Sequence, residues 1–565
     1  MDSSNHPLPI VTSENRFAED RPLQALLARH VSPSARALAE PWLREMGQLS
    51  AGPVDELAFQ ADANPPVLER YDRRGDRADR VVYHAAYRGL EEMSFGRGIV
   101  GNFYDDRNRV CLGPHEWQVK FAMCYLFAQA EQGVYCPIAM TDAAAHLVEL
   151  HAAPELRDKF LPGLTASRLE DLKTGAMFLT EREGGSDVGA NTALAHAGDG
   201  GYRITGDKWF CSNASAQIMM VLARVIQADG GTIPGTRGLG LFLVPATLDD
   251  GSPNALRIKR LKNKLGTRSM PTGEVTLRDA IGYPVGPVSE GFRIMTGMLN
   301  VCRMHNAVAA LALTRRVLWE AAEYAAQRKA FGKPVDSYLL VQDLLCGLFA
   351  ELEAGLEVLF SVGLDFQDGG SDPETLGCLR LMTPLLKLNT AKLAVRAASE
   401  AVELLGGNGF IEEYVTARFY RDAQVLPVWE GTTNILYLDA LRWIVKAKAH
   451  RAVGARIERL LAPAAATPLG EVVENLRQQN ASLQSGFEQL DQVPQEAAPL
   501  AVKRLCDALW PLYGLARLLP HAGNNYRVAA VVHRLLMKMS GPAAPLQAEE
   551  LPQAYQTIVR DACTV

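Results

Sequence analysis

Apolar residues recur at helical spacing in the stretch that follows Glu430. They lie three or four positions apart, which predicts a helix from about Thr433: Ile435, Leu438, Leu441, Ile444 and Val445. Gly431 and the residues after it are turn and N-cap types, so Glu430 is predicted to lie on the bend before this helix. A helix N-terminus favours an anion. Glu430 therefore either complements the helix dipole or, kept dry beside Trp429, serves as a base whose pKa is raised by burial.

The hydrophobic pattern changes along the chain and predicts four domains. Residues 1–173 read as mostly helical, and residues 174–287 carry short strand-like runs between turn residues. Residues 288–445 return to long amphipathic helices, and 446–565 form a further helical region after a proline-bearing linker. The predicted strands are 201–206, 218–225, 239–244 and 273–277, which indicate a small barrel or sandwich. The expected fold is α+β and multidomain.

Composition narrows the class of protein. The 565 residues are 48% hydrophobic and 22% charged, which is typical of a soluble globular enzyme with several domains. The net charge of −6 gives no whole-protein case for nucleic acid binding, and nine scattered cysteines argue against a full disulfide framework. We expect no metal site. Residues 1–19 lack the features of a signal peptide and no apolar run reaches transmembrane length, so we expect a cytoplasmic protein without a membrane partner.

Two polar motifs open the predicted strand region. The stretch 177–188, MFLTEREGGSDV, offers hydroxyls and glycine backbone N–H groups to a polar ligand. The stretch 208–213, KWFCSN, places aromatic faces beside a hydroxyl. Either motif alone is weak, because Gly-Gly-Ser-Asp is more often a turn and Trp-Phe more often core. Their occurrence together with WEGT at 429–432 indicates a common ligand site.

These motifs, with others in the same order, resemble the acyl-CoA dehydrogenase flavoprotein family. The matching stretches are LTE and GSD within 179–187, GDKWF at 206–210, KLGTRS at 264–269, QRKAFGKP at 327–334, LLGGNGF at 404–410, RD at 421–422 and WEGT at 429–432. The matched region covers about residues 115 to 445. The N-terminal extension, the wording TEREGGSD at 180–187 and the long C-terminal region resemble the branch of the family that is associated with the bacterial response to DNA alkylation.

The resemblance implies a helical N-terminal domain, a middle β domain, a four-helix bundle, bound FAD and a homotetramer. Residues 177–186 would line the isoalloxazine edge and pyrophosphate, and residues 210–212 would lie beside the flavin ring. Arg328, Phe331 and the backbone at 406–407 would reach the FAD of a neighbouring subunit, and residues 428–438 would close over the cofactor. The residues expected to bind FAD are Met177, Leu179, Thr180, Gly185, Ser186, Phe210, Cys211, Ser212, Arg328, Phe331, Gly406, Gly407, Val428, Gly431, Thr432, Asn434 and Leu438.

The resemblance also implies the chemistry. Glu430 matches the catalytic base that removes the Cα proton of an acyl-CoA thioester such as isovaleryl-CoA, and Arg303 matches a nearby arginine. The β-hydrogen leaves as hydride to the flavin, and an electron-transfer flavoprotein is a candidate acceptor of the electrons. Arg182 and Glu183 depart from the small apolar residues found in fast members of the family, which puts charge near the approach to the cofactor.

The C-terminal region leaves two functions open. Residues 446–565 hold 13 Lys and Arg against 10 Asp and Glu, a net charge of +3, whereas the preceding residues carry −9. In the branch named above this region is credited with binding double-stranded DNA, and the candidate contacts are Arg442, Lys446, Lys448, Arg451 and Arg456. Alternatively, the protein is an ordinary short- or branched-chain acyl-CoA dehydrogenase whose C-terminal helices form an oligomer contact with a solvated basic face.

Overall fold

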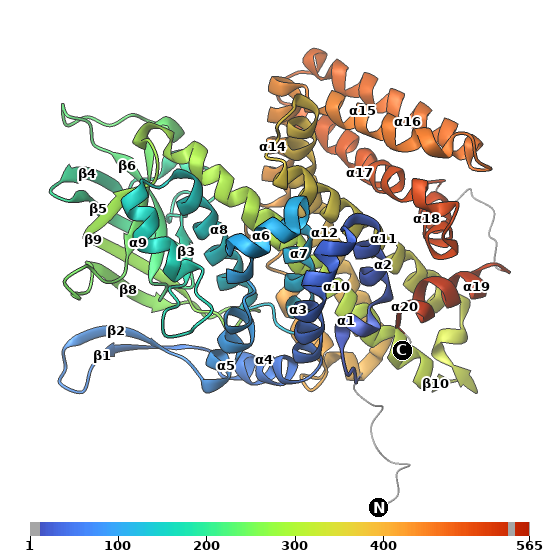
Figure 1. Ribbon diagram of the computed structural model, residues 1–565, viewed down its shortest axis with the longest axis horizontal. Coiled ribbons are helices and arrows are strands. Elements are labelled where there is room, and N and C mark those ends of the chain that lie inside the picture. Colours follow the sequence, from blue (N-terminus) through green and yellow to red (C-terminus); the bar gives the residue numbers. More distant parts are fainter. Residues whose placement is uncertain (1–11, 541–548, 564–565) are drawn as a thin grey trace, which may run out of the picture. The chain divides into compact units, whose positions relative to one another are not determined.

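The computed structural model describes residues 12–540 and 549–563. The segment 1–11, which belongs to the stretch where we expect no signal peptide, lies outside them. The chain folds into two compact units, each assembled from separate stretches of sequence (Figure 1). Unit 1 comprises Met1–Ala51, Cys111–Gln129 and Asn306–Val565, and unit 2 comprises Gly52–Val110 and Ala130–His305.

Unit 1 is helical, and its centre is the pair α11 (Leu339–Gln367) and α12 (Pro373–Leu405). Asp372 caps α12 by accepting hydrogen bonds from the backbone N–H groups of residues 374 and 375, and a proline occupies the first helical position. Helices α14 (Thr433–Ala447) and α15 (Ala449–Leu461) pack on α12. The predicted start of a helix near Thr433 is confirmed.

Further helices surround this pair. Helices α17 and α18 pack on α11, α16 packs on α15 and α17, and α3 packs on α7. The helix α10 (Gly291–Gln327) runs from unit 2 into unit 1. The other elements are α1 (Arg16–Glu19), α2 (Arg21–His30), α3 (Pro33–Ala51), α7 (Glu116–Ala128), β10 (Lys329–Ala330), β11 (Lys333–Pro334), α13 (Val415–Ala423), α16 (Gly470–Glu488), α17 (Ala498–Ala522), α18 (Tyr526–Ser540), α19 (Leu551–Tyr555) and α20 (Asp561–Cys563).

Unit 2 is built around a closed β-barrel. Its neighbouring strands are β6, β4, β5, β9 and β7, and β7 pairs with β6 to close the ring. Strand β3 adds to β6 in parallel, and β8 adds to β9 in antiparallel. The strands are β3 (Gly175–Phe178), β4 (Leu194–Gly198), β5 (Gly201–Ser212), β6 (Ile218–Val225), β7 (Leu239–Pro245), β8 (Leu256–Leu261) and β9 (Thr272–Pro284). Each predicted strand is confirmed, and the barrel settles the choice between barrel and sandwich.

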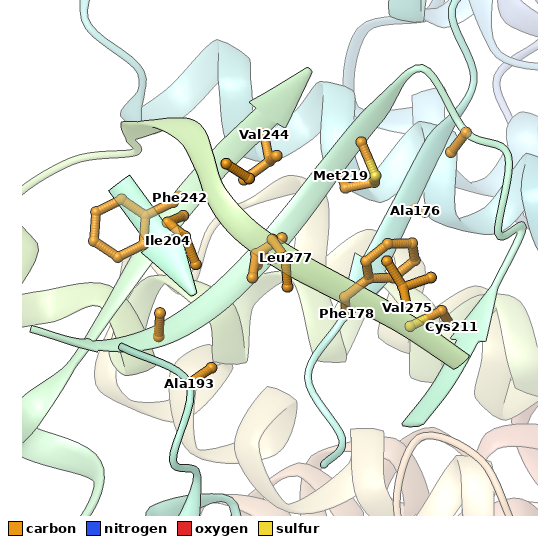
Figure 2. Close-up of a cluster of buried hydrophobic side chains, with 14 of the residues drawn as sticks. Ala176, Phe178, Ala193, Ile204, Cys211, Met219, Phe242, Val244, Val275 and Leu277 are labelled. Carbon is orange, nitrogen blue, oxygen red and sulfur yellow. The ribbon is translucent and has the colours of Figure 1, made fainter. Parts of the chain in front are cut away.

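Alternation along the barrel strands fills the interior with apolar side chains. Phe242 and Ile204 lie at one end of the cluster in Figure 2, Leu277 lies at its centre, and Phe178 and Cys211 lie at the other end. All five side chains are buried. Because successive strand residues point to opposite faces, the residues on either side of Cys211 point outward from the barrel.

A hairpin interrupts the helices of unit 2. Strands β1 (Val67–Tyr71) and β2 (Arg77–Val82) form a two-stranded antiparallel sheet that extends beside β8 (Figure 1). The hairpin lies within residues 1–173, which the sequence predicted to be mostly helical. Buried and exposed side chains do not alternate there, because nearly every side chain is exposed. Val81 is buried in the barrel core, and Leu68 packs against that core. The helices of this unit are α4 (Pro53–Ala63), α5 (Ala85–Ser94), α6 (Asp106–Leu112), α8 (Tyr135–His151) and α9 (Pro154–Leu164).

Among residues 12–540 and 549–563, no helix is long and apolar enough to cross a lipid bilayer. The same described residues contain no group of three or more His, Cys, Asp and Glu side chains arranged to hold a metal ion.

Candidate active site

In unit 1, Glu430 lies on the bend that leads into α14. Its φ is +57°, which is the left-handed region that side chains other than glycine rarely adopt, and Gly431 follows with φ +99°. A non-glycine residue in this region costs on the order of 1–3 kcal/mol and persists only where the surrounding structure enforces it. Glu430 is half-buried, and the free N–H end of α14 lies directly after it. A carboxylate on a strained bend at the mouth of a helix is a candidate functional group.

Two buried side chains of unit 1 hold this bend from its two ends. Asn306 on α10 donates from Nδ2 to the carbonyl oxygen of Leu426 at 3.2 Å. Lys387 on α12 donates from Nζ to the carbonyl oxygen of Gly431 at 2.6 Å. Asn306 is 3% exposed and Lys387 is fully buried. Both donors lie on long helices, so the backbone on either side of Glu430 is fixed by rigid elements.

Other strained positions fall in the motifs that the sequence marked. The described residues include seven non-glycine residues with positive φ. Besides Glu430, three lie in the candidate motifs: Asn213 directly after β5, Thr267 in KLGTRS and Phe331 in QRKAFGKP. The other three, Asp79, Asp279 and Lys448, lie outside these motifs.

In unit 2, the loop between β3 and β4 carries the predicted flavin-binding residues, and a buried ion pair fixes its start. Lys208 on β5 donates from Nζ to Glu181 Oε1 and to the carbonyl oxygen of Leu222, both at 2.7 Å. Glu181 also accepts hydrogen bonds from the backbone N–H and hydroxyl of Thr192 at 2.6 and 2.8 Å. Burial would raise the pKa of Glu181, but Lys208 and Thr192 together lower this pKa below its ordinary value. The carboxylate therefore stays charged and ties both ends of the loop together.

Arg224 fixes the far end of the same loop. Its guanidinium is 9% exposed and donates to the carbonyl oxygens of Gly189 at 2.7 Å and Asn191 at 3.1 Å. It also donates to the carbonyl oxygen of Gly235 at 3.1 Å. The loop between these two anchors leaves Gly185 and Ser186 exposed, whereas Thr180 is half-buried. The predicted hydroxyls and glycine backbone are thus presented to solvent by a held loop.

Strand β5 presents an aromatic face beside this loop. Phe210 is 56% exposed, and Ser212 lies on the same side of the strand. Between them Cys211 is fully buried in the barrel core, where burial raises the pKa of its thiol. The Cys211 side chain points into the barrel core, so a ligand contact of this residue would be made by its backbone. Met177 is half-buried and Leu179 is buried on the approach to the loop.

The charge that departs from the family pattern is held against an aromatic ring. The Arg182 guanidinium lies 4.6 Å from the ring centroid of Trp209, and the Lys262 ammonium lies 3.7 Å from the same ring. Cation–π contacts of this kind hold the cations on the barrel surface. Trp209 is also bonded to the loop, since its backbone N–H donates to the carbonyl oxygen of Thr180 at 2.9 Å.

Three domain families match the chain in order. They are the adaptive response protein AidB N-terminal domain over residues 5–171, the acyl-CoA dehydrogenase middle domain over 176–280 and the acyl-CoA dehydrogenase C-terminal domain over 289–445. Acyl-CoA dehydrogenase family member 11 of Caenorhabditis elegans is 31% identical over 535 residues, which cover 91% of this chain and 85% of that protein. The chain belongs to the acyl-CoA dehydrogenase family. AidB of Escherichia coli K12 is 34% identical over 456 residues, covering 78% of this chain and 80% of AidB, so the chain is an AidB-like member.

Solved structures of family members agree with this fold. The structure of C. elegans ACDH-11 in complex with C11-CoA has a TM-score of 0.87 at 29% identity and covers 100% of this chain and 98% of that one. The apo-form of Bd2924 has a TM-score of 0.82 at 31% identity and covers 92% of this chain and 100% of that one. The expected acyl-CoA dehydrogenase-like fold is confirmed.

FAD is the cofactor of the acyl-CoA dehydrogenase family, and the residues of this chain fit it. Unit 2 offers the exposed aromatic face of Phe210 beside exposed hydroxyl and glycine backbone groups, a combination suited to a flavin ring and a polar phosphate chain. Unit 1 offers exposed side chains before and in α14, namely Val428, Thr432, Asn434 and Leu438, of which the last two lie on one face of the helix. Trp429 Nε1 is buried without a hydrogen-bond partner among the described residues, as expected where a ligand completes a site.

The remaining predicted residues belong to both units, and Arg303 is buried whereas the others are exposed. Arg303 lies on α10 in unit 2 and is 9% exposed, with Nη1 donating to Asn300 Oδ1 at 3.3 Å. In unit 1 Arg328, Gly406 and Gly407 are exposed, and Phe331 is 98% exposed on the hairpin of β10 and β11. Full exposure of a phenylalanine is unusual, so this hairpin has the character of a contact surface.

The C-terminal bases face carboxylates rather than solvent alone. Arg456 pairs with Asp365 at 3.1 Å and with Glu374 at 2.7 Å, and its side chain is 11% exposed. The other predicted DNA contacts pair as follows: Lys448 with Asp491 at 2.8 Å, Arg451 with Glu488 at 2.6 Å and Arg442 with Asp439 at 4.0 Å. Arg456 therefore joins α15 to α11 and α12, whereas Arg442 and Lys446 on α14 remain exposed.

The sequence analysis missed three positioning groups: Asn306, Lys387 and Arg224. A signal was present for two of them. Lys387 is a lone cation within the apolar run LLKL on α12, and Arg224 is a lone cation in the buried strand β6. A single charge within an apolar run is predicted to be buried with a polar partner, so such a residue is a candidate for a structural or positioning role.

Proposed function

We propose that this protein catalyses the FAD-dependent α,β-dehydrogenation of an acyl-CoA thioester, with Glu430 as the base. The observation that carries the proposal is the bend at Glu430: a carboxylate at positive φ, at the mouth of α14, between two carbonyl groups held by buried donors. A Cα proton next to a thioester is a weak acid, so the base must be oriented before the reaction. This bend supplies that orientation without relying on loop motion.

The steps assigned to this chain are binding and proton removal. Glu430 takes the Cα proton, and the site keeps water away from the carboxylate through its half-buried position. Bound FAD supplies the acceptor for the β-hydrogen and its electron pair. An electron-transfer flavoprotein is the proposed partner that removes the electrons afterwards. Arg328 and Phe331 are proposed to reach the FAD of a neighbouring subunit in a homotetramer, which is supported by the exposure of this arginine and phenylalanine at the hairpin.

The proposed substrate is a short or branched acyl-CoA such as isovaleryl-CoA. The relative from C. elegans binds C11-CoA in its structure, so a longer chain belongs in the same test. The experiment is an anaerobic titration of the holoprotein with butyryl-, isovaleryl- and undecanoyl-CoA, followed by the loss of visible flavin absorbance. Bleaching by at least one of them supports the proposal. A flavin that stays oxidised with every chain length, in protein that carries full FAD, overturns it.

Double-stranded DNA binding is the second candidate. It is supported by the similarity to AidB and by the exposed Arg442 and Lys446, whereas the ion pairs of Lys448, Arg451 and Arg456 weigh against a broad phosphate-binding surface. Binding through phosphates falls with salt, with a slope of about −0.9 per neutralised phosphate on duplex DNA. A salt-titrated assay of the parent and of an R442E/K446E variant decides the matter, because an unchanged slope places any DNA site elsewhere.

A further inference from the structure

Lys387 is a charged group in the core of unit 1 that the reaction described above leaves without a task. It lies within α12 between Leu386 and Leu388, and its side chain is fully buried. Its ammonium reaches the carbonyl oxygen of Gly431 at 2.6 Å. Burying an ammonium group is costly, and an apolar residue of the same length would fill this position more cheaply. The lysine therefore has a task that packing alone does not explain.

The carbonyl that Lys387 binds has no place in a helix. Helix α14 begins at Thr433, and the first carbonyl that enters its ladder is that of Thr432, which accepts from the N–H of Leu436 at 3.0 Å. The carbonyl of Gly431 lies one residue earlier, on the bend, where no helical N–H reaches it. The Lys387 ammonium thus sets the orientation of the peptide group that directly follows the two positive-φ residues.

The other end of the bend is held in the same manner. Asn306 on α10 donates to the carbonyl oxygen of Leu426, and its side chain is 3% exposed. Its Oδ1 atom is buried and has no hydrogen-bond partner among the described residues, so the donor group carries the interaction that keeps this amide in place. Two long helices of unit 1 therefore clamp the segment that contains Glu430, one at each end.

We propose that Lys387 and Asn306 are positioning residues that hold the carboxylate of Glu430 in its reactive orientation. The inference rests on the proposed dehydrogenase function. A base that sits at positive φ relaxes toward ordinary backbone conformations when its neighbours release it. A small displacement of a catalytic group lowers the rate steeply while substrate binding through the rest of the site is unaffected. Loss of either clamp therefore lowers kcat and leaves KM nearly unchanged.

The test uses full-length FAD-loaded protein and two near-isosteric variants, Lys387→Met and Asn306→Leu. The matched control is Lys392→Met, which removes an exposed lysine from the same helix. Steady-state kinetics with the most active acyl-CoA are measured beside FAD content and amide hydrogen exchange of peptides spanning 424–434. We expect each clamp variant to lower kcat by at least about tenfold, with KM within about threefold of the parent and full FAD content. Exchange in 424–434 should accelerate in both variants and stay unchanged in the control.

Several outcomes overturn the inference. One is a parent-like kcat and parent-like exchange in both variants, and another is a fall in kcat that only follows lost FAD or lost folded protein. If Lys387→Met does not fold and Asn306→Leu is fully active, both residues belong to the core alone. If none of the acyl-CoA compounds reduces the flavin of the parent protein, the proposed function is contradicted instead. In that case the exchange measurement still decides whether the two residues hold the bend.

Discussion

Lys208 and Glu181 form an ion pair in the interior of unit 2, with Nζ and Oε1 2.7 Å apart and side chains 0% and 4% exposed. The pair joins β5 to the loop that carries the predicted flavin contacts. Removing one partner of a buried pair leaves an uncompensated charge, whereas removing an exposed ion pair has little effect.

Lys208→Met should therefore destabilise the protein by about 3 kcal/mol and weaken FAD binding by about tenfold. The measurements are chemical denaturation of the apoprotein and the FAD dissociation constant. Lys259→Met is the control, because Lys259 is exposed and pairs with Asp207 on the barrel surface. The double variant E181Q/K208M should recover part of the lost stability, since the buried carboxylate is then neutral. A single variant as stable as the parent would contradict the role of the pair.

Glu430→Gln keeps the shape of the side chain and removes the base. We expect retained folding and FAD content, with acyl-CoA-driven flavin bleaching slowed by at least about a hundredfold, the lower range for general base catalysis. Stopped-flow absorbance measures the rate. Glu413→Gln, an exposed acid that precedes α13, is the control. Equal rates in the parent and in Glu430→Gln would leave Glu430 as an acid that only complements the dipole of α14.

Arg328→Ala should loosen both the flavin and the assembly. Arg328 is exposed at the start of the hairpin whose tip carries the fully exposed Phe331. If this hairpin reaches the cofactor of a second subunit, its loss raises the FAD dissociation constant and lowers the oligomeric mass at micromolar concentration. Analytical ultracentrifugation and flavin fluorescence report these two quantities. Lys329→Ala, at the adjacent exposed position, should change neither, and an unaltered Arg328→Ala protein would remove the assignment.

Glu357 makes the stability of unit 1 depend on acidic pH. It lies on α11 with Arg29 Nε at 3.0 Å and His30 Nε2 at 2.5 Å. Burial would raise the pKa of Glu357, but the hydrogen bond from His30 and the charges of His30 and Arg29 lower the pKa to about 2. Because this pKa lies below the ordinary 4.5, the carboxylate stabilises the fold above pH 4.5, and this stabilisation is lost as the pH falls toward 2.

The loss should amount to about 3 kcal/mol at most. Denaturant unfolding of the apoprotein between about pH 5 and about pH 2, the edges of this window, measures it. Glu357→Gln should be less stable at neutral pH and should show a flatter pH dependence. Glu403→Gln, an exposed acid near the end of α12, should keep the slope of the parent. A parent whose stability does not change over this window would contradict the depressed pKa.

Arg456→Met should destabilise unit 1 by about 3 kcal/mol, because it leaves Asp365 buried without its cation. Asp365 is 8% exposed in its side chain, and burial raises its pKa even with Arg456 present. Lys446→Met is the control on the exposed side of the basic run and should change the unfolding free energy by less than about 0.5 kcal/mol. If the two variants were equally stable, the ion pairs of Arg456 would not be needed for the fold, and its charge could instead contact phosphates.

The strands of the barrel were predictable because they are short apolar runs between turn residues, and the helix after Glu430 because its apolar residues repeat at helical spacing. The hairpin of β1 and β2 was not, because its side chains are almost all exposed and its partner β8 lies far away in sequence. Such a hairpin is defined by tertiary contact rather than by its own pattern. The motif at 429–432 located the strained bend at Glu430. An unusual backbone conformation requires particular residue types, and those residue types are what made the motif recognisable.

The supporting groups of the site were beyond the sequence for a different reason. Lys387 and Asn306 donate to backbone carbonyl oxygens. Every residue type has this group, so the sequence does not indicate which residue accepts the hydrogen bond. The inward turn of Cys211 depends on the register of β5 against β9, where a bulge between Lys208 and Cys211 shifts the pairing. Motif reasoning assigns a stretch to a ligand, whereas strand alternation decides which of its side chains can touch that ligand.

Arg315 joins parts of unit 1 that are made at very different times during synthesis. Its buried guanidinium donates from Nε to Asp20, 295 positions earlier, at 3.2 Å, and from Nη2 to the carbonyl oxygen of Ala562, 247 positions later, at 2.6 Å. At 5–20 residues per second, the helices near Asp20 emerge from the ribosome on the order of a minute before Ala562 does. All residues of the unit 2 barrel have been synthesised before that interval ends, whereas the N-terminal helices of unit 1 remain without their C-terminal packing partners until the chain is complete. The core of unit 1 is therefore completed only after the C-terminal residues have been synthesised.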